Sequence, residues 1–174
     1  MNDRARILLF TGDGKGKTTA ALGMALRARG HGMPVCVVQF VKGDASVGEV
    51  AAARLCGIEV HQTGLGFVPA SDDPRFAQHR TAAREGLRQA REILAGRRFA
   101  MLILDEVCLA VARGLLETEQ VIELLRQAPA ETCLVLTGRD APPALVALAD
   151  TVTEMLCVKH ALQSGRVAQQ GVER

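Results

Sequence analysis

A chain of 174 residues has the usual size of one domain and buries roughly 70% of the surface of its unfolded form. Its net charge of +2 is too small to indicate nucleic acid or a membrane as a partner, and no apolar stretch approaches the ~20 residues that span a bilayer. Hydrophobic residues make up 48% of the chain, without Trp or Tyr, so we expect an aliphatic core.

The expected elements alternate between strand and helix from the first residues onward. Short apolar runs predict buried strands of a parallel sheet at 7–10, 35–40, 101–104 and 133–136, with weaker strand patterns at 58–61 and 152–158. Helical spacing and end signals predict helices at 18–29, 73–94, 118–126 and 142–148. The longest irregular stretch is 64–74. Residues 1–174 are therefore expected to form one three-layer α/β domain with a mostly parallel central sheet.

The five cysteines are odd in number and include no close pair, which indicates reduced thiols. The N-terminal residues resemble no signal peptide. A cytoplasmic protein is expected.

Residues 8–23, LLFTGDGKGKTTAALG, place a glycine-rich loop between the first strand and the first helix. Such a loop surrounds a phosphate with backbone N–H groups at the positive end of a helix dipole. Lys17 is expected to contact the phosphates, and the Thr18 hydroxyl to hold Mg²⁺. The motif G-x-x-x-x-G-K-[ST] would have its first glycine at position 11, where this chain has Thr11. The loop predicts a P-loop NTPase-like (RecA-like) fold.

Two further strands are expected to bring polar side chains to the same sheet edge. MLILDE, residues 101–106, resembles a Walker B strand: Asp105 is expected to bind the metal directly or through water, and Glu106 to polarise a water or contact the metal. LTGRDAP, residues 136–142, brings Arg139, a candidate clamp for a phosphate or a carboxylate, with a turn pair to Asp140 as the alternative.

Two features leave alternatives open. The arginines at 80, 84, 88 and 91 form a stripe on one helix; a solvated face is favoured over nucleic acid, because no aromatic residues interleave. In TGLGFVP, residues 63–69, Phe67 is either tucked against the core or offered to an apolar ligand.

Taken together, TGDGKGKTTAALG, RARGHG, VVQFVKG, TGLGF, LDEV, LTGR and VKHALQSGRVAQQGVE resemble the P-loop type of ATP:corrinoid (cob(I)alamin) adenosyltransferase, over nearly the whole chain. The resemblance implies transfer of the 5′-deoxyadenosyl group of ATP to cobalt(I) of a reduced corrinoid, with release of tripolyphosphate, in adenosylcobalamin biosynthesis or salvage. In this family the short loop holds ATP in the opposite direction to the usual one, because the reacting atom is the ribose C5′ rather than the γ-phosphorus.

The resemblance also implies the roles of individual residues. Lys17, Thr18 and Glu106 would be catalytic, and Thr18, Glu106 and Asp105 would hold Mg²⁺ (or Mn²⁺). The implied ATP-binding residues are Gly12, Asp13, Gly14, Lys15, Gly16, Lys17, Thr18, Thr19, Arg27 and Arg139. The implied corrinoid-binding residues are Gly66, Phe67, Val68 and Pro69.

This chain departs from the family pattern at three places. Asp13 stands where Asn is more usual, and Pro69 where Trp is common. Family members often carry an additional N-terminal segment that covers the neighbouring subunit's site, whereas the first strand here is expected at Ile7.

The implied partners are ATP, the corrinoid, a flavoprotein reductase and a second copy in a homodimer. The alternatives are a phosphoryl-transferring P-loop enzyme, or a non-catalytic corrinoid- or nucleotide-binding module.

Overall fold

The structure, a computed structural model, describes residues 4–161 and 165–172. Its strands are β1 (Arg6–Thr11), β2 (Val35–Gln39), β3 (Glu59–Gln62), β4 (Met101–Asp105), β5 (Cys133–Thr137) and β6 (Thr151–Glu154). Its helices are α1 (Lys17–Gly30), α2 (Gly48–Leu55), α3 (Phe76–Ala95), α4 (Val107–Ala112), α5 (Thr118–Arg126) and α6 (Pro143–Leu148).

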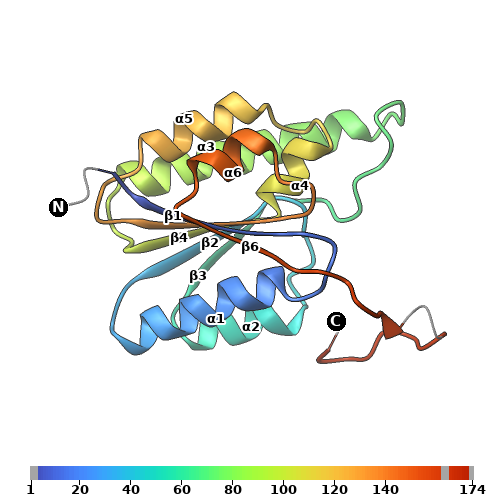
Figure 1. The fold of residues 1–174 in the computed structure, drawn as a ribbon, viewed down its shortest axis with the longest axis horizontal. Helices are drawn as coiled ribbons and strands as arrows, with labels where there is room; N and C mark the ends of the chain where they lie inside the picture. Colours follow the sequence, from blue (N-terminus) through green and yellow to red (C-terminus); the bar gives the residue numbers. More distant parts are fainter. Residues whose placement is uncertain (1–3, 162–164, 173–174) are drawn as a thin grey trace.

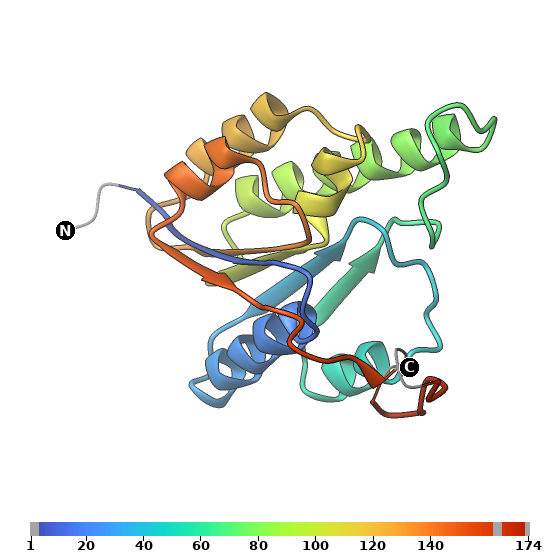
Figure 2. The same cartoon turned by 45° about the vertical axis from the view of Figure 1, so that its right-hand side comes forward.

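The strands form one sheet in the order β3-β2-β4-β5-β1-β6, and every pairing is parallel. Helices α1 and α2 cover one face of the sheet, and α3 to α6 cover the other (Figure 1). The same arrangement is visible after a turn of the molecule (Figure 2). The predicted three-layer α/β fold is confirmed, and the sheet is parallel throughout the described residues.

The core lies in two clusters, one on each face of the sheet. Leu87, Leu102, Leu124 and Leu136 belong to the cluster on the α3 side. Ala21 and Ala25 of α1 pack on the other side, where small residues let the helix approach the sheet closely. The expected aliphatic core is therefore present on both faces.

Two helices were not predicted from the sequence. The residues of α4, VCLAVA, are apolar all round, so in the sequence they are difficult to distinguish from a continuation of the buried β4. Helix α2 is short and rich in alanine, and only Val50 and Ala53 of it are buried.

Two predicted boundaries were wrong. Helix α3 begins at Phe76 rather than at residue 73, because the Asp73 carboxylate accepts the backbone N–H of Arg75 at 2.8 Å and forms a turn. Strand β6 ends at Glu154 rather than at residue 158.

All five cysteines are free thiols, as expected. Among the described residues, no helix has the length and apolar character needed to cross a membrane.

Candidate functional site

The glycine loop connects β1 to α1 and ends in an open helix N-terminus. Gly16 is the N-cap of α1 at φ 112°, a conformation that favours glycine, and no side chain caps this end. The first turn of α1 contains no acidic residue. Lys17 folds back over the loop and donates from Nζ to the carbonyls of Gly12 at 2.7 Å and Gly14 at 2.8 Å. The loop therefore presents backbone N–H groups and one ammonium to an anion.

The glycines of this loop also allow a close approach of the chain after β6. A Cβ on Gly12 would lie 2.5 Å from the Met155 carbonyl oxygen, and a Cβ on Gly14 would lie 2.7 Å from that of Leu156. The Gly14 N–H donates to the Met155 carbonyl at 2.6 Å. This contact, which sequence reasoning missed, fixes the loop from outside, because backbone atoms on both sides leave no room for a side chain.

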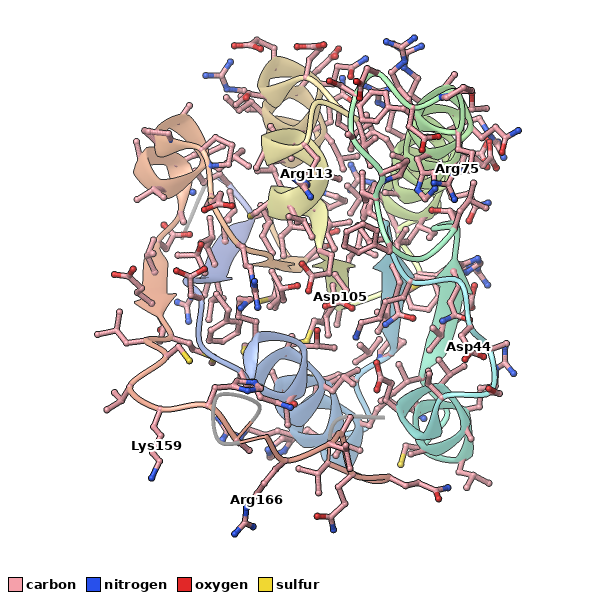
Figure 3. All side chains as sticks on the ribbon, turned by 90° about the vertical axis from the view of Figure 1, so that its right-hand side faces the viewer. Asp44, Arg75, Asp105, Arg113, Lys159 and Arg166 are labelled. Carbon is pink, nitrogen blue, oxygen red and sulfur yellow. The ribbon has the colours of Figure 1, made fainter. Side chains whose placement is uncertain are left out.

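Asp105, at the end of β4, is the centre of a buried hydrogen-bond network and lies near the middle of the carboxyl edge of the sheet (Figure 3). Its Oδ1 accepts the hydroxyls of Thr18 and Thr137, each at 2.8 Å. Its Oδ2 accepts Nε2 of Gln39 at 3.0 Å. The Asp105 side chain is 0% exposed, so these donors offset the cost of burying its charge. Asp105 thereby orients the hydroxyl of Thr18.

Glu106 follows Asp105 in a left-handed conformation, at φ 62°, and its N–H donates to the Thr137 hydroxyl at 2.8 Å. Its Oε2 is buried and has no hydrogen-bond partner among the described residues. Burial and the nearby charge of Asp105 raise the pKa of Glu106, while Lys17 opposes the shift. A buried carboxylate oxygen without a partner, close to the Thr18–Asp105 pair, is what a hard cation such as Mg²⁺ would satisfy.

Lys42 joins this network, although sequence reasoning assigned it no role. Its Nζ contacts Glu49 at 2.7 Å, Thr18 Oγ1 at 3.4 Å and Asp105 Oδ2 at 3.5 Å. Burial alone would lower the pKa of Lys42, but Asp105 and Glu49 outweigh it and leave the pKa raised. The signals in the sequence were its place in the motif VVQFVKG and its position shortly after an apolar strand.

The remaining predicted ATP ligands divide into two groups. Arg139 is exposed after β5, and its charge reaches the site: burial lowers the pKa of Lys17 and Arg139 adds to that shift, while Arg139 opposes the rise in the pKa of Glu106. Asp13, Lys15 and Thr19 are exposed on or beside the loop. Arg27 is exposed on α1, ten residues beyond Lys17, which is about 15 Å along the helix axis. The structure therefore brings Arg139 to the loop and leaves Arg27 apart from it.

The loop between β3 and α3, residues 63–75, presents Phe67 to solvent. The Phe67 side chain is 87% exposed, whereas Val68 is 5% exposed and belongs to the core. Pro69 is buried beside it. Phe67 and Pro69 line an open hollow of about 680 Å³; Leu65, Ala70, Asp73, Arg75, Gln78 and His79 line the rest of it. The structure therefore excludes the interpretation in which Phe67 is tucked against the core.

Close backbone contacts connect this loop to the phosphate site. The Gly66 N–H donates to the Val41 carbonyl at 2.8 Å, directly before Lys42. A Cβ on Gly64 would lie 2.0 Å from the carbonyl carbon of Val41, so only glycine fits there. The glycines of TGLGF are therefore required for this backbone contact. The contact joins the Phe67 loop to the segment after β2, where Lys42 contacts Thr18.

A glycine loop before a helix, a hydrogen bond from Thr18 to the buried Asp105, and a parallel sheet define a P-loop nucleotide-binding protein. The solved structure of the flagellar accessory protein FlaH from Methanocaldococcus jannaschii has a similar fold, with a TM-score of 0.55 and 12% sequence identity, over 86% of this chain and 70% of that one. At that identity the likeness concerns the fold alone.

The chain belongs to the ATP:corrinoid adenosyltransferase family, whose model, described as ATP:corrinoid adenosyltransferase BtuR/CobO/CobP, matches residues 3–174. It is 42% identical over 174 residues to a corrinoid adenosyltransferase of Pseudomonas aeruginosa, covering 99% of this chain and 85% of the relative. It is 40% identical over 172 residues to that of Escherichia coli K12, covering 99% and 87%. The resemblance found in the sequence is confirmed.

Proposed function

We propose that this protein transfers the 5′-deoxyadenosyl group of ATP to cobalt(I) of a reduced corrinoid and releases tripolyphosphate. The observation that carries the proposal is the family match over residues 3–174. The geometry of the phosphate loop and the exposure of Phe67 at the same sheet edge support it.

The triphosphate binds at the N-terminus of α1. The loop amides and Lys17 neutralise its charge, and Arg139 approaches it from the end of β5. Lys17 is suited to this role because its Nζ is already held by the Gly12 and Gly14 carbonyls at the mouth of the loop. Arg27 lies too far along α1 to join this set, so we assign it no contact with the triphosphate.

Mg²⁺ fits beside Thr18 and Glu106, where it would add positive charge against the triphosphate. The buried Oε2 of Glu106 supports this assignment. Asp105 accepts three hydrogen bonds from protein groups, so its part is to orient the Thr18 hydroxyl. Its own contact with the metal would be direct or through a water.

The transfer step requires no nucleophile from the protein, because cobalt(I) supplies the electron pair. The cobalt–C5′ bond forms as the C5′–O5′ bond breaks; cobalt is oxidised from (I) to (III), and the tripolyphosphate leaves with the bonding pair. The work of the protein is alignment, which contributes ~7–11 kcal/mol in well-oriented reactions, and stabilisation of charge on the leaving group.

The corrinoid lies against the exposed face of the 63–75 loop. Phe67 shields the cobalt from an axial ligand, while Val68 and Pro69 anchor the loop from below and Gly66 ties it to Val41. An electron donor must first reduce the corrinoid cobalt to cobalt(I). A flavoprotein reductase remains our prediction for this donor. A homodimer, and a single domain over residues 1–174, remain predictions as well.

The deciding experiment is anaerobic incubation of the full chain with ATP, Mg²⁺ and a chemically reduced corrinoid. We expect a light-sensitive cobalt–carbon product together with stoichiometric tripolyphosphate. ADP or phosphate as the product would indicate phosphoryl transfer instead. Corrinoid and ATP binding without turnover would indicate a binding module.

A further inference from the structure

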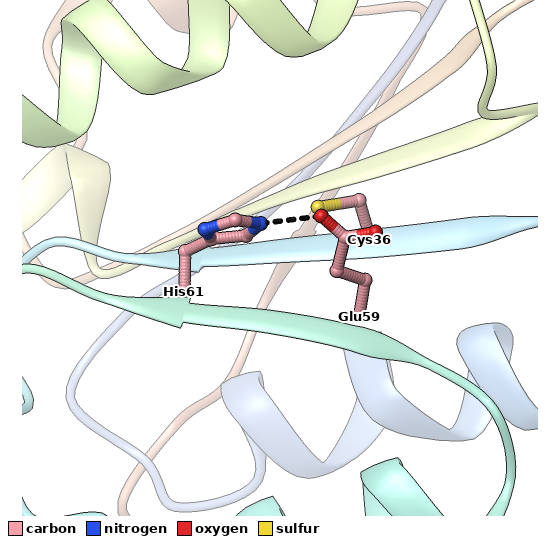
Figure 4. Close-up of side chains that lie close together, drawn as sticks. All are labelled: Cys36, Glu59 and His61. Atoms are coloured by element: carbon pink, nitrogen blue, oxygen red, sulfur yellow. Dashed lines mark hydrogen bonds and ion pairs between the residues drawn. The ribbon is translucent and has the colours of Figure 1, made fainter.

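Three side chains able to bind a metal lie together on β2 and β3, outside the proposed active site (Figure 4). Cys36 pairs in register with Glu59, and Val38 pairs with His61. Because residues two apart on a strand point to the same face, Glu59 and His61 lie on one side of the sheet with Cys36. One donor atom from each residue lies within 4.8 Å of the other two.

We propose that Cys36, Glu59 and His61 form a site for Zn²⁺ or a metal of similar preference. A thiolate, an imidazole and a carboxylate are the three ligand types that zinc takes in proteins. Three protein ligands leave a fourth tetrahedral position for water. His61 and Glu59 are partly exposed, so this position is open to solvent.

Because the three donor atoms lie within 4.8 Å of one another, a bound metal requires side-chain movements of roughly 1 Å. Zinc bonds of ~2.0–2.3 Å place tetrahedral ligand atoms about 3.3–3.6 Å apart. His61 Nε2 and Glu59 Oε1 are now hydrogen-bonded at 2.7 Å, so a metal would separate them by about half an ångström. Both side chains can move, because they stand on an edge strand with solvent beside them.

The surroundings of the site include one opposing charge. Arg98 Nη2 lies 3.9 Å from Glu59 Oε1, and the Arg98 guanidinium stacks on the Phe99 ring. Arg98 is exposed and would turn to solvent as the metal binds. Burial and Glu59 raise the pKa of Cys36 to about 12, so the metal-free residue is a thiol. On binding, the sulfur–metal bond replaces S–H and the proton leaves to solvent.

A metal here would cross-link the edge of the sheet. Within the described residues β3 pairs with β2 alone, and its last residue leads into the loop that carries Phe67. Gln62, next to His61, donates to the Gln39 side chain at 2.9 Å, and Gln39 contacts Asp105. The cross-link would therefore stabilise the strand from which the Phe67 loop leaves.

The test uses the full chain, reduced, with excess Mg²⁺ present to occupy any site for hard cations. Titration with Co²⁺ should give one bound ion per chain and a sulfur-to-cobalt charge-transfer band, which Zn²⁺ abolishes by displacement. Cys36→Ser should lose the band, whereas Cys56→Ser, at an exposed cysteine, should keep it. Zn²⁺ at about 100 times its Kd should raise the Tm by about 5–10 °C.

Glu59→Gln and His61→Gln provide the second measurement, because neither residue belongs to the core and both variants should fold. Each should weaken zinc affinity at least tenfold and remove most of the Tm shift. The proposal is overturned if wild type binds no stoichiometric Zn²⁺ at micromolar concentration. It is overturned equally if these variants bind as wild type does, or if the band depends on Cys56.

Discussion

The glycine loop and the Phe67 loop lie at the same edge of the sheet, yet the side chains that we propose bind the ligands are held in opposite ways. At the glycine loop, Lys17 is 7% exposed and Asp105 is fully buried, and each is fixed by several hydrogen bonds. At the other loop, Phe67 is 87% exposed and only its neighbours anchor the chain. Charged groups must be held in a fixed orientation before the ligand binds. An apolar side chain only needs to be exposed where the ligand can pack against it.

If the comparison holds, changes at the glycine loop affect ATP handling and changes at Phe67 affect the corrinoid. The largest effect is expected from Lys17→Met, which keeps the buried stem and removes the ammonium. The rate from pre-reduced corrinoid should fall at least about 100-fold, or ~2.7 kcal/mol, because charge on the leaving tripolyphosphate loses its main partner. Lys159→Met, at an exposed lysine, is the control. A Lys17 variant within tenfold of wild type would contradict the assignment.

Glu106→Gln should have the next largest effect. It should lower the rate about 10–100-fold and raise the Mg²⁺ concentration needed for half-maximal activity, since the amide is a poorer ligand for a hard cation. Stability should not fall: the raised pKa means that folding disfavours the ionised carboxyl, and the variant removes that charge. Urea unfolding checks the second point. A clear loss of stability with an unchanged Mg²⁺ requirement would make Glu106 a structural residue.

Gly14→Ala tests whether the chain after β6 fixes the loop. Its new Cβ would meet backbone atoms of Met155 and Leu156 at 2.7 Å, so one segment must move. We expect a loss of about 1–3 kcal/mol in stability and at least tenfold in ATP affinity, measured by urea unfolding and calorimetry. Gly23→Ala is the matched control, because its Cβ would meet nothing within 4 Å and alanine favours helix. Equal effects of the two substitutions would show that the contact is unimportant.

The same contact marks the limit of what the sequence could predict. The parallel sheet, the glycine loop and the Asp105 strand end follow from local patterns, because each depends on residues adjacent in the chain. The approach of Met155 to Gly14 joins segments about 140 residues apart, and no local pattern encodes such a pairing. Helix α4 was missed because its uniformly apolar residues carry no helical periodicity.

Lys42 and Phe67 illustrate the same limit in the site. Lys42 follows β2, and its place in the site depends on three contacts, with residues of α1, α2 and β4. Only the fold brings these three elements together. Phe67 was recognised in the sequence as an aromatic residue in a loop. Its exposure depends on whether Val68 or Phe67 points inward, and an irregular loop has no regular alternation of inward and outward side chains that would predict this.

The smallest effect on stability, and the most selective effect on function, is expected for Phe67→Ala. The side chain is exposed, so the free energy of unfolding should change by less than about 0.5 kcal/mol. Activity from cobalt(II) with a protein reductant should fall at least tenfold, because water can then reach the cobalt as an axial ligand. Activity from pre-reduced cobalt(I) should fall much less, and ATP affinity should stay the same.

Val68→Ala, one residue further, should show the opposite signature: a loss of about 1–3 kcal/mol in stability and parallel falls in both assays. If Phe67→Ala instead behaved like Val68→Ala, the two loops would not divide the work, and Phe67 would support the fold rather than the corrinoid.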